Sequence, residues 1–314
     1  MAFELKLLSG SSHPELARKL AAELGIELEP VKIEKFSCGE IYVQPQSSLR
    51  GHDVFIVQTG TQNSNEDLME LFLLIDSVKR SFAGKVHVVM PHLPYARQDR
   101  VAAKREPISA KLVADLLEAS GADHVICVDL HSEQIQGFFD RPMDSIKAQP
   151  LFVKYFMDKH PGDIVVVAPD AGGAKNAKRF ADVIGAELAI MNKTRPGMNQ
   201  SEVTHLVGNV CGKHCIVYDD MVDTAGSVSG AAKFLRAHGA DKEVYLAATH
   251  AVFSGPAYER LLEADFTEIV VTDSLPIKHQ EKLPNLKVLS LAPLLSKIIF
   301  NIHEGFSVSE AMEN

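Results

Sequence analysis

Cys215-Ile216-Val217-Tyr218-Asp219-Asp220-Met221-Val222-Asp223-Thr224-Ala225-Gly226-Ser227 is the stretch that decides the fold of this chain. An apolar, β-branched run leads into three acids and a small, hydroxyl-rich turn, and helix-like spacing follows. The free N–H groups at a helix start and the Thr224 and Ser227 hydroxyls can hold a phosphate dianion, and the helix dipole assists. The two acids before the turn can accept hydrogen bonds from sugar hydroxyls. We therefore predict a sugar-phosphate site formed by Asp219, Asp220, Asp223, Thr224, Ala225, Gly226 and Ser227.

A plainer interpretation of this stretch is structural. Asp219 and Asp220 would only end a strand, and Asp223 with Thr224 would only cap a helix, which is the commoner role of a short acid-Gly-Ser turn. The order of all thirteen residues favours the phosphate site instead. No lysine follows Gly226, so the stretch is not a GxxxxGK[ST] nucleotide loop.

Similar strand-like runs recur along the chain and alternate with helix-like stretches. Each run has four to six residues and is apolar nearly throughout, which is typical of strands covered on both faces. We expect strands at 53–57, 86–90, 124–128, 164–168, 214–218, 244–248 and 268–272. We expect helices at 67–80, 109–119, 174–183, 227–238 and 294–303, and one that begins at a capping box of residues 12–15 and stops at Gly25. This alternation predicts an α/β fold with mostly parallel sheets.

The composition limits the function classes. With 314 residues, of which 46% are hydrophobic, the chain has room for two domains, and we place the boundary near the two prolines of residues 141–150. Its apolar runs are shorter than the roughly 20 residues that a membrane span needs, and its start has no secretory pattern. The net charge of −9 argues against nucleic acid as the main partner. Four cysteines without CxxC spacing suggest neither disulfides nor zinc, so we expect a cytoplasmic protein with reduced thiols.

The deciding stretch resembles the phosphoribosyl-pyrophosphate-binding motif of the phosphoribosyltransferase fold, and other motifs narrow the resemblance to the ribose-phosphate pyrophosphokinase family. The stretch Val128-Asp129-Leu130-His131-Ser132-Glu133-Gln134-Ile135-Gln136-Gly137-Phe138-Phe139 is similar to a signature of that family. Pro94-Tyr95-Ala96-Arg97-Gln98-Asp99-Arg100, Ala168-Pro169-Asp170-Ala171-Gly172-Gly173 and Phe253-Ser254-Gly255-Pro256 also match. The resemblance runs from about Lys6 to the C-terminus.

The resemblance implies two phosphoribosyltransferase-like domains, each a mostly parallel sheet flanked by helices. Residues 1–147 would form the ATP side, with the C-terminal helix 295–314 packing on it, and residues 148–294 would form the ribose 5-phosphate side. The implied reaction moves a diphosphoryl group from ATP to the anomeric hydroxyl of ribose 5-phosphate. The implied assembly is a homo-oligomer, a hexamer, in which a neighbouring subunit contributes Phe36 and Glu40 to the ATP site.

The resemblance also implies residue roles. Lys193 and Arg195 would be catalytic, with Arg195 also on the sugar-phosphate side, because fixed cations stabilise charge that spreads over a transferring phosphoryl group. His131 and Asp170 follow apolar strands and would hold Mg²⁺ around the triphosphate, with Asp129 as a supporting residue if its strand persists. ATP would bind Phe36, Cys38, Gly39, Glu40, Arg97, Gln98 and Asp99. Without the resemblance, a surface histidine and a solvated basic turn are the commoner interpretations. For Phe36 the alternative is an ordinary core residue, which a Gly-Glu turn disfavours.

The chain departs from the family pattern in two places. Cys38 stands where the usual motif has an acid, and sulfur is a poor acceptor for an adenine amino group, so nucleotide affinity or purine choice is in doubt. The loop 100–107 carries Val101 and Ala103, which cannot bind an oxyanion, beside Arg100, Lys104 and Arg105. Arg50, Ser48, Gln136, Asp144 and Ser309 match positions of the family's regulatory site. We therefore predict weaker phosphate activation than in typical relatives.

Two alternatives stay open at this point. A phosphoribosyltransferase would keep the sugar-phosphate turn but would be indifferent to ATP. A non-catalytic regulatory paralogue would bind synthetase subunits, and Cys38 with the altered loop gives it some support.

Overall fold

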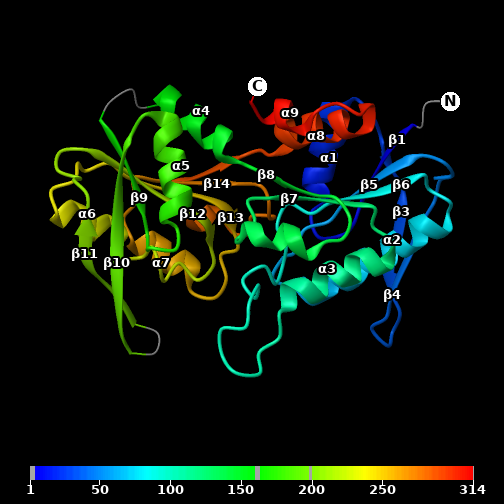
Figure 1. Cartoon of the computed structure of the whole chain (residues 1–314), viewed down its shortest axis with the longest axis horizontal. Coiled ribbons are helices and arrows are strands. Elements are labelled where there is room, and N and C mark those ends of the chain that lie inside the picture. Colours follow the sequence, from blue (N-terminus) through cyan, green and yellow to red (C-terminus); the bar gives the residue numbers. More distant parts are fainter. Residues whose placement is uncertain (1–3, 160–162, 198–199, 314) are drawn as a thin grey trace. The chain divides into compact units, whose positions relative to one another are not determined.

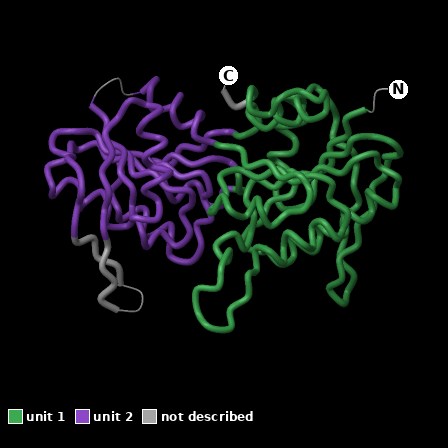
Figure 2. Tube along the Cα trace, viewed as in Figure 1, with its two compact units in different colours: residues 1–147, 274–276, 291–314 green, residues 148–273, 277–290 purple. Residues whose placement is uncertain are grey.

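The computed structural model describes residues 4–159, 163–197 and 200–313, with side chains for all of these except 193–204, 312 and 313. The chain forms two compact units, which Figure 2 colours separately. Unit 1 consists of residues 1–147, 274–276 and 291–314, and unit 2 of residues 148–273 and 277–290. Each unit contains a mostly parallel sheet flanked by helices, which confirms the predicted α/β fold class (Figure 1).

The main sheet of unit 1 has six strands in the order β2-β1-β5-β6-β7-β8, and every neighbouring pair is parallel. Its strands are β1 (Leu5–Ser9), β2 (Leu28–Glu29), β5 (Asp53–Val57), β6 (Lys85–Val89), β7 (His124–Val128) and β8 (Met143–Ile146). Three of the central strands, β5, β6 and β7, are almost wholly buried because helices cover both faces, and this explains their continuous apolar sequence.

Helices cover the unit 1 sheet from both sides. On one face α2 (Ser64–Arg80) and α3 (Ser109–Ser120) share a core with Val54, Ile56 and Val88. α1 (Pro14–Leu24) packs against α8 (Ala292–Glu304), which is followed by α9 (Val308–Glu313). The C-terminal helices therefore belong to unit 1, and a contact of 3.1 Å between His303 Nδ1 and Asp53 Oδ2 ties α8 to β5.

The start of α1 differs from the predicted capping box. His13 is the N-cap, and its Nδ1 accepts a hydrogen bond from the Leu16 amide at 3.4 Å. Ser12 cannot cap the helix because its hydroxyl donates to Oε1 of Gln58 on the sheet side, at 2.6 Å. The helix stops at Gly25 as predicted, in the left-handed conformation with φ 66° that a glycine adopts without steric cost.

Unit 2 has a seven-stranded sheet in the order β11-β10-β9-β12-β13-β14-β15. Its strands are β9 (Ile164–Ala168), β10 (Glu187–Gly197), β11 (Gln200–Val207), β12 (His214–Val222), β13 (Val244–Ala251), β14 (Glu268–Thr272) and β15 (Leu286–Leu289). All neighbouring strands are parallel except β10 and β11, which pair antiparallel. β12 extends four residues beyond the predicted strand end, through Val222.

The helices of unit 2 pack against both faces of its sheet. α6 (Ala231–Ala237) and α7 (Ala257–Glu263) pack against Val217, Leu246 and Ile269 on one face of the sheet. α4 (Gln149–Lys159) and α5 (Ala174–Ile184) supply aromatic rings to the other face, where Phe180 stacks on Tyr218 with ring centres 4.4 Å apart. The described helices include none that is long and apolar enough to cross a membrane.

A separate two-stranded hairpin in unit 1 was not predicted. β3 (Val31–Lys35) pairs antiparallel with β4 (Ile41–Pro45), and the five residues 36–40 form its tip (Figure 1). Its strands alternate partly buried with exposed residues, a pattern too short and too polar to stand out among the apolar runs of the sheets.

Candidate functional site

The carboxyl ends of three adjacent strands in unit 2 bring predicted site residues to one edge of the sheet. Ile190 of β10 pairs with Ala168 of β9, and Val217 of β12 pairs with Val167. Asp170, two residues after β9, therefore emerges at the same edge as the acids at the end of β12. Two polar segments far apart in sequence meet because the strands that carry them are neighbours.

The predicted catalytic pair lies on the neighbouring strand. Lys193 and Arg195 lie inside β10, which continues through Gly197, so they do not belong to a solvated turn after a strand. Strand pairing places Lys193 opposite Val203 of β11. Their side chains lie outside the described residues, so their roles stay predictions.

Asp219 has an electrostatic environment that calls for a cation or a hydrogen-bond donor. Burial raises its pKa well above the ordinary value, and the neighbouring Asp220 and the more distant Asp170 add to the rise. One oxygen of Asp219 accepts the Asp220 amide at 2.9 Å, which opposes the rise. Like charges in a partly buried place are costly unless a ligand compensates them. The arrangement therefore suits sugar hydroxyls, which donate hydrogen bonds, or a divalent cation.

The turn after β12, which we call the 223–227 loop, is braced by the segment after β13. The Ser254 amide donates to the Asp223 carbonyl at 3.0 Å, and the Ser254 hydroxyl donates to the Asp223 carboxylate. Arg260 Nη1 donates to the Thr224 carbonyl at 3.0 Å. Asp223 thus helps to hold the loop itself, beyond any contact that it makes to a sugar.

The 223–227 loop does not open a helix directly, so the prediction of a helix from Ser227 was wrong. Tight turns occupy residues 226–230, where Ser229 bonds back to Ala225 at 2.9 Å, and α6 begins only at Ala231. With seven residues, and starting after the loop, α6 cannot contribute the predicted dipole at Thr224. Polar donors must come from the loop backbone instead.

The loop offers such donors. Ala225 adopts a left-handed conformation with φ 57°, which is uncommon outside glycine and asparagine. Within the described residues, neither the Thr224 amide nor the Ala225 amide donates a hydrogen bond, and the Thr224 hydroxyl also makes none. Successive amides around a left-handed residue form an anion-binding concavity. This geometry supports the predicted phosphate contact.

The two predicted metal-binding residues belong to different units. His131 follows β7 of unit 1 and is exposed, whereas Asp170 follows β9 of unit 2 and accepts the Gly173 amide at 3.0 Å. In the part of the chain that is described, no group of three or more His, Cys, Asp or Glu side chains is arranged to hold a metal. The few carboxylates at the unit 2 edge fit an ion such as Mg²⁺, which prefers oxygen and keeps several waters or phosphate oxygens as ligands.

Asp129 does not support His131 in the way that a continuing strand would allow. β7 ends at Val128, and Asp129 has φ 38°, so the chain turns away from the strand direction. Its carboxylate lies 3.7 Å from Lys147 Nζ instead. The supporting role of Asp129 was predicted on the condition that its strand persists, and this condition is not met.

The predicted ATP residues 36–40 form the tip of the β3–β4 hairpin. Phe36 is 55% exposed, so it is not a core residue, and its ring lies edge-on to that of Tyr42, with ring centres 5.9 Å apart. Gly39 has φ 95° and closes the turn through its amide, which donates to the Phe36 carbonyl at 2.8 Å. Cys38 is exposed and unpaired. The tip thus presents an aromatic face and Glu40 to solvent.

The second ATP segment, residues 97–99, lies in the loop after β6. Gln98 is fixed by α3, because its side-chain oxygen accepts the Ser109 hydroxyl at 2.7 Å. Both ATP segments are linked to the first turn of α2: Lys35, directly before the hairpin tip, pairs with Glu66, and Tyr95 donates to Asn65. The start of α2 therefore joins two segments that are about 60 residues apart in the sequence.

The predicted regulatory positions carry interactions of their own. The Arg50 guanidinium lies 4.5 Å from the centre of the Phe82 ring. Asp144 contacts His124 Nε2 at 3.1 Å. In the altered loop, the Glu106 carboxylate accepts the Ala102 and Ala103 amides, which folds the loop on itself. Weak phosphate activation stays a prediction.

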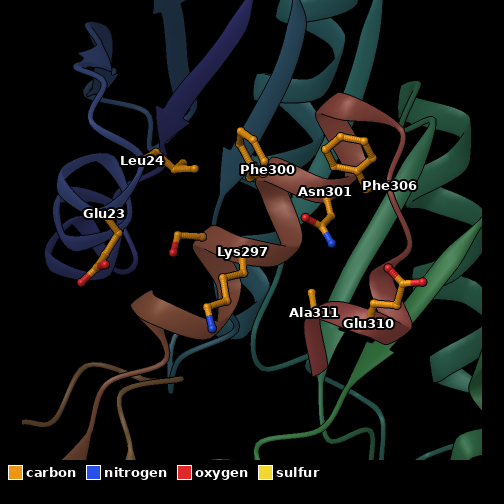
Figure 3. A pocket seen from close by; sticks show the side chains of 9 residues that line it. Glu23, Leu24, Lys297, Phe300, Asn301, Phe306, Glu310 and Ala311 are labelled. Atoms are coloured by element: carbon orange, nitrogen blue, oxygen red, sulfur yellow. The ribbon is translucent and has the colours of Figure 1, made fainter. Parts of the chain in front are cut away.

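A groove of about 650 Å³ lies elsewhere on unit 1 (Figure 3). Leu24 of α1, Lys297 and Phe300 of α8, and Glu310 of α9 line it, and none of the residues singled out from the sequence does. It is not part of the predicted site.

Two functional candidates were missed from the sequence. Ser254 lies in one of the matching motifs, but no role was predicted for it. Arg260 was not predicted because it lies 36 residues from Thr224 in the sequence. Only the pairing of β12 with β13 reveals that their following segments meet.

The fold and the acidic, hydroxyl-bearing loop define a phosphoribosyl-handling α/β enzyme. Residues 5–121 match the N-terminal domain of ribose phosphate pyrophosphokinase, and residues 189–312 match the phosphoribosyl synthetase-associated domain. The chain belongs to the ribose-phosphate pyrophosphokinase family.

Full-length relatives support this placement. The chain is 47% identical to the ribose-phosphate pyrophosphokinase of Caldanaerobacter subterraneus, covering 98% of this chain and 97% of the relative. It is 45% identical to that of Bacillus subtilis, covering 97% and 96%. The crystal structure of phosphoribosylpyrophosphate synthetase from Mycobacterium smegmatis superposes with a TM-score of 0.90 at 44% identity, covering 96% of this chain and 99% of the other.

Proposed function

We propose that this chain transfers the β,γ-diphosphoryl group of ATP to the anomeric hydroxyl of ribose 5-phosphate, giving phosphoribosyl pyrophosphate and AMP. Ribose-phosphate diphosphokinase activity follows from family membership. One observation supports this location of the sugar phosphate. The amides of Thr224 and Ala225 donate no hydrogen bond within the described residues, and they follow Asp219 and Asp220 directly after the carboxyl end of β12.

In this proposal the 5-phosphate binds the 223–227 loop, and the ribose hydroxyls donate to Asp219 and Asp220. Those hydrogen bonds favour the charged form of Asp219 and so offset the burial that raises its pKa. Lys193 and Arg195 of β10, which β9 separates from β12, would then serve the transferred group. The anomeric oxygen attacks the β-phosphorus in line and AMP leaves, so positioning and fixed positive charge provide the acceleration.

Mg²⁺ is the metal that suits this chemistry, because it neutralises charge on the phosphate oxygens of bound ATP. We assign Asp170 of unit 2 and His131 of unit 1 to its surroundings, Asp170 as an oxygen ligand and His131 as a contact to its water shell. Both follow parallel strands at the carboxyl end, where ligands of α/β sheets bind.

We assign ATP to unit 1, with the purine against Phe36 and Glu40 and the phosphates near Arg97, Gln98 and Asp99. The exposure of the Phe36 ring supports a role that a ligand or a neighbouring subunit completes. We propose a homo-oligomer, a hexamer, in which the hairpin tip serves a neighbouring subunit. We also propose a cytoplasmic location, which the four unpaired cysteines support, and no role for nucleic acid.

The decisive experiment mixes the purified protein with ATP, Mg²⁺ and ribose 5-phosphate and follows the nucleotide product. We expect AMP to form only when ribose 5-phosphate and the metal are both present. ADP as the product, or turnover that does not depend on the pentose, would contradict diphosphoryl transfer.

A further inference from the structure

Arg260 of α7 is a cation beside the 223–227 loop that the proposed chemistry does not yet use. The residue as a whole is partly buried, and Nη1 of its guanidinium donates to the Thr224 carbonyl at 3.0 Å. A Cβ atom at position 226 would lie 3.4 Å from the same nitrogen, so the guanidinium covers Gly226 as well.

The guanidinium has a charge that the described residues do not neutralise. No carboxylate of the described chain lies within ion-pair distance of Arg260, and its other N–H groups donate no hydrogen bond there. A partly buried cation is stabilised by a neighbouring negative charge. A bound phosphate at the 223–227 loop would supply it.

The hydrogen bond to Thr224 also fixes the direction of a donor. The Thr224 carbonyl and the Ala225 N–H belong to one planar trans peptide, in which they point in opposite directions. When Arg260 holds the carbonyl, the Ala225 N–H must point away from Arg260, and the cation polarises the peptide so that this N–H becomes a stronger donor. Ala225 has φ 57°, a strained conformation for a residue with a Cβ, and such strain persists only where neighbouring contacts hold it.

We propose that Arg260 is the positioning residue of the sugar-phosphate site: it holds the Thr224–Ala225 peptide so that the Ala225 N–H faces the 5-phosphate, and its charge favours the dianion. Arg260 acts through this peptide and does not touch the phosphate. The inference rests on the proposed function only in taking the ligand of the loop to be ribose 5-phosphate.

The test compares Arg260→Gln and Arg260→Lys with a matched control, Arg236→Gln. Arg236 lies on α6 of the same unit, and its guanidinium also donates to a backbone carbonyl, that of Lys242 at 3.0 Å. Steady-state kinetics would give KM for each substrate and kcat, and calorimetry would give the affinity for ribose 5-phosphate alone.

We expect Arg260→Gln to raise the KM and Kd for ribose 5-phosphate about tenfold or more, since charge-assisted hydrogen bonds are the strong ones. The KM for ATP should change less than about twofold, because unit 1 carries the nucleotide residues. Arg260→Lys should recover part of the loss, because an ammonium can still donate to the Thr224 carbonyl. Arg236→Gln should leave all these constants unchanged.

Three results would overturn the inference: an unchanged affinity for ribose 5-phosphate in Arg260→Gln, an equal rise in both KM values, or the same change in Arg236→Gln. If Arg260→Gln did not fold, the decision would rest on Arg260→Lys: with intact thermal unfolding, an affinity for ribose 5-phosphate equal to that of the wild type would count against positioning. If the wild type bound ribose 5-phosphate but released no AMP, the proposed function would fail while the calorimetric comparison still decided on Arg260.

Discussion

We predict that the 223–227 loop binds ribose 5-phosphate and that the hairpin tip of residues 36–40 binds ATP. The two regions differ in how they are supported. The loop follows β12, a central strand of a seven-stranded sheet, and Ser254 and Arg260 brace it from the segment after the next strand. The tip closes a two-stranded hairpin, and its Phe36 ring is mostly exposed. The loop is braced within its own unit, whereas the tip presents an exposed aromatic ring.

The difference predicts how each region responds to mutation. Asp223 and Thr224 of the 223–227 loop are held by Ser254 and Arg260, so substitutions of these loop residues should change affinity and stability together. Residues at the hairpin tip make few contacts within the chain, so substitutions there should change nucleotide affinity and leave folding intact. The following predictions test this contrast, beginning with the largest effect.

Lys193→Ala should reduce kcat by about a hundredfold or more, because removal of one preorganised charge at a transition state has effects of that size. The melting temperature should stay within a few degrees of the wild type. Lys178→Ala is the matched control, since Lys178 lies on α5 of the same unit, where it pairs with Asp182 on the surface. Turnover equal to that of the control would remove Lys193 from the catalytic role.

His87 should make unit 1 sensitive to acid. It is 4% exposed, stacks on Phe55, and lies 3.2 Å from His124 Nδ1. Burial and the neighbouring His124 lower its pKa from 6.5 to about 4. The unfolded chain therefore takes up the proton first, so stability should fall as the pH drops from about 6.5 towards 4, by about 2 kcal/mol at pH 5.

Hydrogen exchange of the β6 amides between pH 7 and pH 5 would measure this loss in unit 1 alone. His87→Phe should flatten the pH dependence, whereas His279→Gln, at an exposed position in unit 2, should not. Asp219 of unit 2 should change stability in the opposite direction. Because its pKa is raised, the folded state takes up the proton first, so acid relieves the repulsion between Asp219 and Asp220 and stabilises unit 2. Equal acid sensitivity of the β6 and β12 amides would contradict the contrast.

Asp220→Asn should raise the KM for ribose 5-phosphate about tenfold, as expected for the loss of a hydrogen bond to a charged group. The same change removes a like charge beside Asp219, so the ligand-free protein should become more stable at neutral pH. Thermal unfolding with and without ribose 5-phosphate would show both effects. A variant with weaker binding and lower stability would indicate that Asp220 only supports the fold.

Much of the sheet architecture follows from sequence, and the reasons for the failures are physical. The strands 53–57, 124–128, 164–168 and 268–272 were predicted to the residue, because burial on both faces demands continuous apolar runs. The condition set for Asp129 is not met and the helix at 227 was mispredicted because strand and helix ends depend on local turns, such as the left-handed Ala225, which periodicity does not show. Arg260 lies beyond any local pattern because only tertiary packing brings it to Thr224.

Phe36→Ala tests the other side of the contrast and should have the smallest effect. Loss of one ring that stacks on a purine should raise the KM for ATP about three- to tenfold. Because the ring is mostly exposed, the melting temperature and the KM for ribose 5-phosphate should not change. Phe82→Ala is the control, an aromatic residue of unit 1 that is 65% exposed at another place. If Phe36→Ala lowered the melting temperature as a core substitution does, the tip would be a structural element and the ATP assignment would lose its support.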